Sequence, residues 1–220
     1  MFAPLSKKLA DLGYGVFRFD FRGHGESGGR SVEMTIEGEL ADLEAAVREV
    51  KRKGFKKIGL LGASFGGGTA TIFAALKRKE LQFLCLWYPV LNYDHTFINP
   101  YLPWLKNQMA RMRRDLEEKG WTTIPNDGKP FRIGKKLFDE MNWYFPYKEL
   151  AKIRLPVVII HGDNDSYVPY KDSLEYIKNK PGEAKLITIK GADHGFGGEN
   201  EKLYKEEAIN KTVLTFRRYL

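Results

Sequence analysis

The sequence Gly62-Ala63-Ser64-Phe65-Gly66, a G-x-S-x-G pattern, decides the fold. It directly follows the short apolar run Lys57–Leu61 and directly precedes the helical pattern Gly67–Lys79. A serine in a sharp strand-to-helix turn presents its hydroxyl beyond the edge of a sheet. The small residues Gly62 and Gly66 let the strand and the helix approach closely. The context therefore predicts an elbow between a strand and a helix.

This turn supplies two candidate functional groups. Ser64 is the predicted nucleophile, because the elbow exposes its hydroxyl. The backbone N–H of Phe65 lies at the N-terminus of the following helix, where it can donate to a developing oxyanion. We therefore predict that Phe65 provides one donor of an oxyanion hole.

Two kinds of segment alternate along the chain on either side of the elbow. Short runs rich in β-branched and aromatic residues are typical of buried strands: Tyr14–Phe19, Lys57–Leu61, Gln82–Trp87, Pro156–Ile160 and Lys185–Ile189. The helical patterns around them are Leu5–Leu12, Glu39–Lys53, Gly67–Lys79, Lys171–Lys180 and Glu201–Arg218. This alternation predicts an α/β fold with a mainly parallel sheet and helices on both faces.

One stretch, residues 92–147, interrupts this alternation and is far too long for a connection. It has helical periodicity around Leu105–Glu118. Its aromatic residues are Tyr93, Phe97, Tyr101, Trp104, Trp121, Phe131, Phe138, Trp143, Tyr144 and Phe145. We interpret it as a cap inserted into a core of residues 1–91 and 148–220. Ligands of such sheets bind at the carboxyl ends of the strands, so the cap is expected there, with two or three of its aromatic rings lining a pocket.

The basic charge does not favour a nucleic-acid partner. The formal net charge is +8, but the basic residues are dispersed in short clusters such as Lys51–Lys53, Lys56–Lys57 and Lys77–Lys79. These clusters fall where helices are expected to end, and cations are favourable at helix C-termini. A solvated, lysine-rich surface is therefore expected.

The remaining composition indicates a globular, cytoplasmic protein. No segment approaches the roughly 20 apolar residues of a membrane helix, and Met1–Leu12 has no long apolar core of a secretory signal. The lone cysteine, Cys85, forms no internal disulfide, fits a reducing cytoplasm and is expected to be a small buried hydrophobic residue. Two glutamines among many Lys and Glu residues favour a thermophilic source.

A serine nucleophile needs a base, and the chain has four histidines. His194 follows the last expected strand, so its loop opens at the same sheet edge as Ser64, and we predict that it is the base. His24 lies in a glycine-rich loop, and His95 lies in the expected cap. His161 ends an expected strand and is expected to anchor its loop by hydrogen bonds.

The base in turn needs a carboxylate that holds its tautomer. The run His161–Pro169 follows an expected buried strand and offers Asp163 and Asp165, between which spacing alone does not decide. Asp94, after the preceding expected strand, is a further candidate. The predicted catalytic group is thus a serine, a histidine and one of these aspartates.

Asp20–Ser27, with the sequence DFRGHGES, resembles the D-x-R-G-x-G-x-S loop of the α/β hydrolases. In that family the loop is a structural turn beside the active site. The Ser64 elbow, the H-G-x-x-D-x-x-V-P run His161–Pro169 and the G-A-D-H loop Gly191–His194 also match. The resemblance covers nearly the whole chain outside residues 92–147, and it implies an α/β-hydrolase fold.

The resemblance also selects the acid. The family's acid position in H-G-x-x-D falls on Asp165, and the order Ser64, Asp165, His194 is the one associated with this fold. The most similar subgroup is the small intracellular esterases with a short cap, including cinnamoyl and feruloyl esterases. Serine aminopeptidase-like hydrolases and monoacylglycerol lipases are also similar.

These features predict a serine hydrolase that cleaves carboxylic esters with short acyl or aryl-acyl groups through an acyl-enzyme. The alternatives are an aminopeptidase or amidase, or a monoacylglycerol lipase, on the same triad. For a peptidase, Asp115, Glu117 and Glu118 are candidates to hold an amino terminus, although a solvated helix face also explains them. We expect a small-molecule ester as partner, no membrane association, and no metal or cofactor, because no H-E-x-x-H, cysteine pair or Walker sequence is present. A homodimer remains open.

One departure from the family concerns the start of the chain. Related enzymes have about two or three strands before the helix that resembles Leu5–Leu12, and one of these lies between the strands matching Val16–Phe19 and Ile58–Leu61. Its following loop supplies the second oxyanion N–H, and neither is found in this sequence. We expect truncation, direct pairing of the two flanking strands, or a strand from a partner chain. A further alternative is a non-catalytic binding protein of the hydrolase fold.

Overall fold

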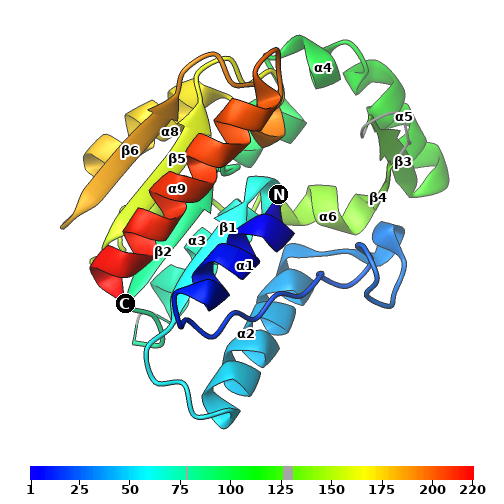
Figure 1. The fold of residues 1–220 in the computed structure, drawn as a ribbon. Helices are drawn as coiled ribbons and strands as arrows, with labels where there is room; N and C mark the ends of the chain where they lie inside the picture. The colour runs from blue at the N-terminus through cyan, green and yellow to red at the C-terminus, as the bar shows by residue number, and fades with distance from the viewer. Residues whose placement is uncertain (78, 126–130) are drawn as a thin grey trace.

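The computed structural model describes residues 1–77, 79–125 and 131–220. Four strands form a parallel sheet in the order β1 (Gly59–Ala63), β2 (Phe83–Trp87), β5 (Val157–Gly162) and β6 (Ala184–Ile189). Each strand begins and ends within two residues of its expected range. The α/β fold with a mainly parallel sheet is therefore confirmed (Figure 1).

Helices cover both faces of this sheet. On one face α1 (Phe2–Asp11) contacts α9 (Glu201–Tyr219), and Figure 1 shows the two helices lying across the strands. The other face carries α2 (Ile36–Arg52), α3 (Ser64–Leu76) and α7 (Pro146–Leu150).

The side chains of β2 divide between these two layers because successive residues of a strand point to opposite faces. Phe83, Cys85 and Trp87 pack with α1 and α9, whereas Leu84 and Leu86 pack with α2 and α3. All five side chains are fully buried, so β2 runs through the centre of the core.

The expected helices are present with modest differences at their ends. α2 begins earlier than expected because the Thr35 hydroxyl accepts a hydrogen bond from Gly38 N at 2.9 Å, which caps the first turn. Two consecutive elements, α8 (Tyr170–Tyr176) and the 3₁₀ helix η3 (Ile177–Asn179), form the expected helix Lys171–Lys180. Arg78, within the expected helix Gly67–Lys79, lies outside the described residues.

The predicted strand Tyr14–Phe19 is wrong. The segment pairs with no strand among the residues that the structure describes, and β1 is hydrogen-bonded to β2 alone. A strand-like sequence becomes a strand only when its backbone N–H and C=O groups find a partner. The two flanking segments therefore do not pair directly, and Phe17 is 46% exposed.

Residues 92–147 are called the inserted segment here. It contains the π-helix η2 (Asp94–Ile98), the helices α4 (Pro103–Lys106), α5 (Met109–Lys119) and α6 (Lys135–Glu140), and an antiparallel pair of strands, β3 (Trp121–Ile124) and β4 (Phe131–Gly134). The expected helical stretch corresponds to α4 and α5, whereas the paired strands were not expected. Residues 126–130 of this predicted cap lie outside the described residues.

The inserted segment shares an apolar cluster with the core, and its two ends lie close together. Phe97, Leu105 and Met112 are buried in a cluster that also includes Met34, just before α2, and Ile72 of α3. Tyr147 N donates to Leu91 O at 2.9 Å, so the two ends of the segment meet. Figure 1 shows α5 with β3 and β4 to one side of the parallel sheet, beyond its helical layers.

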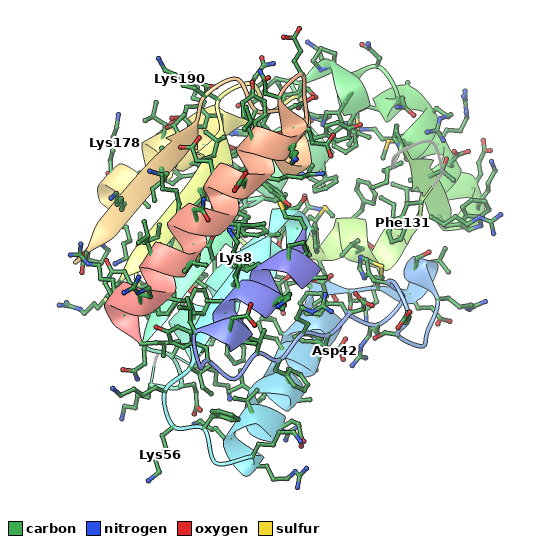
Figure 2. All side chains as sticks on the ribbon, viewed as in Figure 1. Lys8, Asp42, Lys56, Phe131, Lys178 and Lys190 are labelled. Carbon is green, nitrogen blue, oxygen red and sulfur yellow. The ribbon has the colours of Figure 1, made fainter. Side chains whose placement is uncertain are left out.

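In Figure 2 the labelled Lys178 and Lys190 lie near one another by β6, and Lys56 lies at the opposite end of the molecule. Among the described residues, no helix is both long enough and apolar enough to cross a membrane.

Candidate active site

β1 ends at Ala63 and α3 begins at Ser64, so the elbow is as tight as the sequence predicts. Ser64 has φ +51°, a left-handed conformation that is unusual for a residue with a side chain. A Cβ atom at Gly62 would lie 2.6 Å from the Ala70 side chain, and one at Gly66 would lie 3.2 Å from the Phe21 ring. Gly62 therefore permits the predicted close approach of β1 and α3, whereas the close neighbour of Gly66 is Phe21 of the Asp20–Ser27 loop.

Two further glycines of α3 are equally constrained, and the sequence analysis did not single them out. A Cβ at Gly67 would lie 2.8 Å from Pro89, and one at Gly68 would lie 2.6 Å from Val90 O. Both contacts are with the loop that follows β2. The uninterrupted run of three glycines after Phe65 was the available signal.

The structure brings the three predicted triad residues together. The Ser64 Oγ and His194 Nε2 atoms are 3.1 Å apart, and His194 Nδ1 lies 2.8 Å from Asp165 Oδ2. Ser64 begins α3 directly after β1, and Asp165 and His194 follow β5 and β6, so all three lie at the carboxyl end of the sheet. This arrangement can pass a proton from a serine hydroxyl to an imidazole while a carboxylate holds the other ring nitrogen.

The carboxylate of Asp165 is fully enclosed and fully hydrogen-bonded. Its Oδ1 accepts from the backbone N–H groups of Tyr167 and Val168 at 2.9 and 2.7 Å, and its Oδ2 is shared by His161 and His194. Burial alone would raise its pKa, but the hydrogen bonds from the two histidines outweigh burial and hold the pKa of Asp165 well below its usual range. Asp165 is therefore the hydrogen-bond acceptor of this group.

The rival carboxylates have other partners. Asp163 Oδ1 accepts from Gly191 N at 2.6 Å, which ties the acid loop to the histidine loop. Asp94 Oδ1 accepts from Asn99 Nδ2 at 2.7 Å within the inserted segment. Of the three candidate acids, the structure places Asp165 against His194.

Asp193, which sequence reasoning missed, also fixes the relative position of these two loops. Its Oδ1 accepts from Ser166 N at 2.7 Å, from Ser166 Oγ at 2.8 Å and from His194 N at 2.6 Å. The backbone of the base is therefore bonded to the loop that carries the acid. Its place directly before His194 in G-A-D-H was the only sequence signal.

The remaining histidines lie outside the predicted triad. His24 stacks on Phe131 of β4 at 5.3 Å, and burial lowers its pKa. His95 Nδ1 lies 2.8 Å from Asp172 Oδ1. His161 does anchor its surroundings as expected, since Nδ1 lies 2.8 Å from Ser173 Oγ, but its contact with Asp165 was not foreseen.

Phe65 follows Ser64 in the first turn of α3. The first N–H groups of a helix have no acceptor within the helix, so the Phe65 N–H is available to an anion next to Ser64. Its ring packs against Tyr93 and Phe97, with centroids 5.2 and 5.8 Å away. The side chain of Phe65 thus packs against the inserted segment.

The loop Asp20–Ser27 is the structural turn that the resemblance implies. Glu26 N donates to Asp20 Oδ2 at 3.1 Å, and Arg22 pairs with Asp42, labelled in Figure 2 on α2. The loop reaches the elbow through the contact of Phe21 with Gly66.

Aromatic rings surround the imidazole of His194, and two of them were missed. Tyr167 stacks on it with centroids 5.3 Å apart, and Tyr88 meets it edge-on at 4.6 Å. Trp104 of α4 donates from Nε1 to Tyr167 O at 2.8 Å and packs on the Tyr167 ring at 4.8 Å. The inserted segment therefore contacts the loop that carries Asp165.

A separate cavity of about 600 Å³ lies where the inserted segment joins the core. Residues near both ends of the segment, such as His95 and Tyr147, line it together with Glu175 and Tyr176 of α8. No triad residue lines it, so it is not the space above Ser64. Within the described parts of the chain, no group of three His, Cys, Asp or Glu side chains is placed to hold a metal ion.

Comparisons with known proteins agree with this fold. Bacillus subtilis YqkD, an uncharacterised protein, is 26% identical over 212 residues, which are 94% of this chain and 63% of YqkD. The chain thus spans less than two thirds of the length of this curated relative.

Solved structures show the same fold. One is Est1E from Butyrivibrio proteoclasticus with bound ferulic acid (TM-score 0.78, 23% identity, 98% of this chain, 82% of that one). Another is a Paleococcus ferrophilus monoacylglycerol lipase (TM-score 0.73, 20% identity, 96% and 88%). The family model described as serine aminopeptidase, S33, matches residues 1–201. The chain therefore belongs to this family of α/β hydrolases.

Proposed function

We propose that this protein is a serine hydrolase that cleaves carboxylic esters through an acyl-enzyme. The observation that carries the proposal is the continuous chain of hydrogen bonds from Ser64 through His194 to Asp165. Such a chain makes a weakly nucleophilic hydroxyl reactive at neutral pH. The left-handed backbone of Ser64, which elbows use to expose the nucleophile, supports the same role.

In the acylation step, Ser64 Oγ attacks the ester carbonyl carbon while its proton passes to His194 Nε2. Asp165 accepts from His194 Nδ1 throughout and stabilises the imidazolium. The carbonyl oxygen becomes an oxyanion, to which the Phe65 N–H donates. The bond to the alcohol oxygen then breaks, and the alcohol leaves with the proton from His194.

In the deacylation step, His194 takes a proton from a water molecule, and the resulting hydroxide forms a bond to the acyl carbon. The bond between the acyl carbon and Ser64 Oγ breaks, and the serine recovers a proton from His194. The products are a carboxylic acid and the original enzyme. Every proton is carried by His194, so the scheme needs no further ionisable group.

Short acyl or aryl-acyl esters are the proposed substrates. The Tyr167 ring beside His194, with Trp104 of the inserted segment packed on it, supports a binding site that accepts flat groups. Offset stacking on such rings is worth roughly 0.5–1.5 kcal/mol per contact beyond area burial. The structural likeness to Est1E, whose solved structure holds ferulic acid, supports this choice.

An aminopeptidase is the second candidate, because the family description names that activity. A peptidase of this kind needs a free carboxylate for the substrate's amino group. Asp115 is engaged by Arg111 at 2.9 Å and by Lys119 at 2.7 Å, while Glu117 and Glu118 are exposed. These contacts favour the solvated-face interpretation and leave the ester as the preferred substrate.

The test is labelling with a fluorophosphonate probe, followed by turnover of paired substrates. We expect the probe to label Ser64, the parent protein to hydrolyse nitrophenyl acetate, and aminoacyl-arylamides to be poor substrates. Faster hydrolysis of esters with about twelve acyl carbons than of short ones would favour a monoacylglycerol lipase. Absence of labelling would favour a non-catalytic binding protein.

A further inference from the structure

A second histidine bonds to the carboxylate of the triad. His161 Nε2 lies 3.2 Å from Asp165 Oδ2, the same oxygen that His194 Nδ1 approaches at 2.8 Å. The side chains of His161 and Asp165 are both completely buried, whereas that of His194 is 22% exposed. One carboxylate oxygen is therefore shared by a partly exposed imidazole and a fully enclosed one.

The hydrogen-bond partners determine which nitrogen of His161 carries the proton. An ionised carboxylate only accepts, so His161 Nε2 must donate to Asp165. The other ring nitrogen, Nδ1, then accepts, and the Ser173 hydroxyl 2.8 Å away is its donor. Because Ser173 is fully buried on α8, no water competes for this position.

The ring of His161 is also held in place mechanically. It lies on β5 and meets the Tyr170 ring edge-on at 5.5 Å. The Tyr170 hydroxyl is bonded to Thr188 Oγ1 of β6 at 2.6 Å, so Tyr170 is itself fixed. His161 therefore presents its Nε2–H from a rigid position.

We infer that His161 is a positioning residue for the Ser64–His194–Asp165 triad, an inference that rests on the proposed function. Its fixed N–H prevents rotation of the Asp165 carboxylate when His194 moves between substrate and water. Without it, Oδ2 would keep His194 as its only side-chain donor among the described residues. The nearby Asp172 carboxylate and the Tyr170 hydroxyl are the other titratable groups that face His161.

Two replacements of His161 separate hydrogen bonding from packing. A glutamine places an amide N–H near the position of Nε2, whereas a leucine fills similar space without a donor. We expect His161→Leu to lower kcat about 10- to 100-fold with KM within about twofold, because a hydrogen bond to a charged group is lost. His161→Gln should recover most of that loss.

The pH profile supplies a readout that a purely structural role would not move. Loss of one donor leaves the Asp165 carboxylate more able to stabilise a protonated His194. In His161→Leu, the pH of half-maximal kcat/KM should therefore rise by about half a unit. Ser173→Ala should lower kcat about three- to tenfold, because it removes the hydroxyl that donates to His161 Nδ1.

The matched control is His95→Asn, at a histidine that also bonds a buried aspartate. It should leave kcat unchanged, because the hydrogen bond and the ring contact of His95 involve no triad residue among the described residues. If His161→Leu does not fold, His161→Gln and Ser173→Ala carry the comparison. Parent-like kcat in folded His161→Leu or Ser173→Ala would overturn the inference, as would equal losses in folded His161→Leu and His161→Gln.

A second measurement does not depend on turnover. Long-range ¹H–¹⁵N spectra of histidine-labelled protein should show His161 as the neutral form with its proton on Nε2. A proton on Nδ1 would overturn the inference even if the enzyme is active. A parent protein with the expected tautomer but no labelling and no turnover would instead refute the proposed function.

Discussion

Tyr14–Phe19 and β2 are both short runs of aromatic and aliphatic residues, yet their surroundings differ. β2 lies between β1 and β5, and all of its side chains are buried. Tyr14–Phe19 has no strand beside it among the described residues, and Val16, Phe17 and Phe19 are 38–46% exposed. The contrast shows that a strand-like sequence favours an extended backbone, whereas burial depends on a partner strand.

The same contrast applies to the two sides of the candidate active site. The acid and the base come from loops after β5 and β6, which are paired over six positions and joined through Asp163 and Asp193. The nucleophile comes from β1, which is paired on one side only among the described residues. We therefore expect catalysis to depend on the hydrogen bonds of the loops after β5 and β6. We expect stability to be insensitive to changes in Tyr14–Phe19.

The largest effect is expected at the nucleophile, Ser64, which directly follows β1. Ser64→Ala should lower kcat by at least 1,000-fold, because it removes the attacking oxygen and nothing else. Thermal unfolding should be nearly unchanged. Nitrophenyl acetate turnover and circular dichroism on the same samples are the measurements, and residual activity above about 1% would identify another nucleophile.

The loop between β5 and α8 gives a matched pair of carboxylates. Asp165→Asn should reduce kcat by about 1,000-fold with little change in KM, because an amide no longer holds the tautomer of His194. Asp163→Asn should cost less than about tenfold, since Asp163 bonds to Gly191 N and not to His194 among the described residues. The reverse order of the two kcat values would show that the acid is wrongly assigned.

The contrast between β2 and Tyr14–Phe19 can be tested directly with two phenylalanines. Phe83→Ala should reduce the free energy of unfolding by about 3–5 kcal/mol, because Phe83 is fully buried against Phe216. Phe17→Ala should cost less than about 1 kcal/mol, since Phe17 is 46% exposed. Urea denaturation measures both free energies of unfolding. Similar losses of stability in the two variants would mean that Tyr14–Phe19 is covered in solution.

A buried carboxyl on α2, Glu39, gives a predicted effect that depends on pH. Burial raises the pKa of Glu39 from 4.5 to about 7, although the Thr69 hydroxyl donates to it. As pH rises from about 4 to 7, the unfolded chain releases this proton first, so up to about 3 kcal/mol of stability is lost. Asp42 and Tyr93 are the other titratable groups near it.

Glu39→Gln cannot ionise, and its amide oxygen still accepts from Thr69. The stability of Glu39→Gln relative to the parent should therefore increase across this pH range and then level off above about pH 7. Urea denaturation of both proteins at a series of pH values measures the difference. A difference that is constant from pH 4 to 8 would contradict the predicted titration.

Much of the site was predictable because its parts are local in sequence. G-x-S-x-G fixes Ser64 between strand and helix, and the order of strands places the loops of Asp165 and His194 at one edge. Spacing could not choose between Asp163 and Asp165, because both lie in the loop that directly follows β5. The resemblance supplied that choice, and the hydrogen bond to His194 agrees with it.

Features that depend on distant pairs were not predictable. Tyr167, Tyr88 and His161 act through contacts across different loops, which periodicity does not describe. The Tyr14–Phe19 pattern satisfies every local criterion for a strand, but pairing is a property of its neighbours. For the same reason, the paired strands β3 and β4 were hidden in a segment whose strongest signal was helical.

The left-handed backbone of Ser64 has a consequence for how this protein could evolve. Tyr88, which packs on the His194 ring, and Phe196, which packs on Tyr88, also have positive φ values of 36° and 57°. Each such residue costs on the order of 1–3 kcal/mol. Tyr88 and Phe196 are buried, so glycine at either position would leave a cavity that costs more than the strain it relieves. At Ser64, where little side-chain volume is at stake, selection for thermostability alone would favour glycine, and that change would remove the nucleophile. Greater heat resistance must therefore be sought elsewhere in the chain.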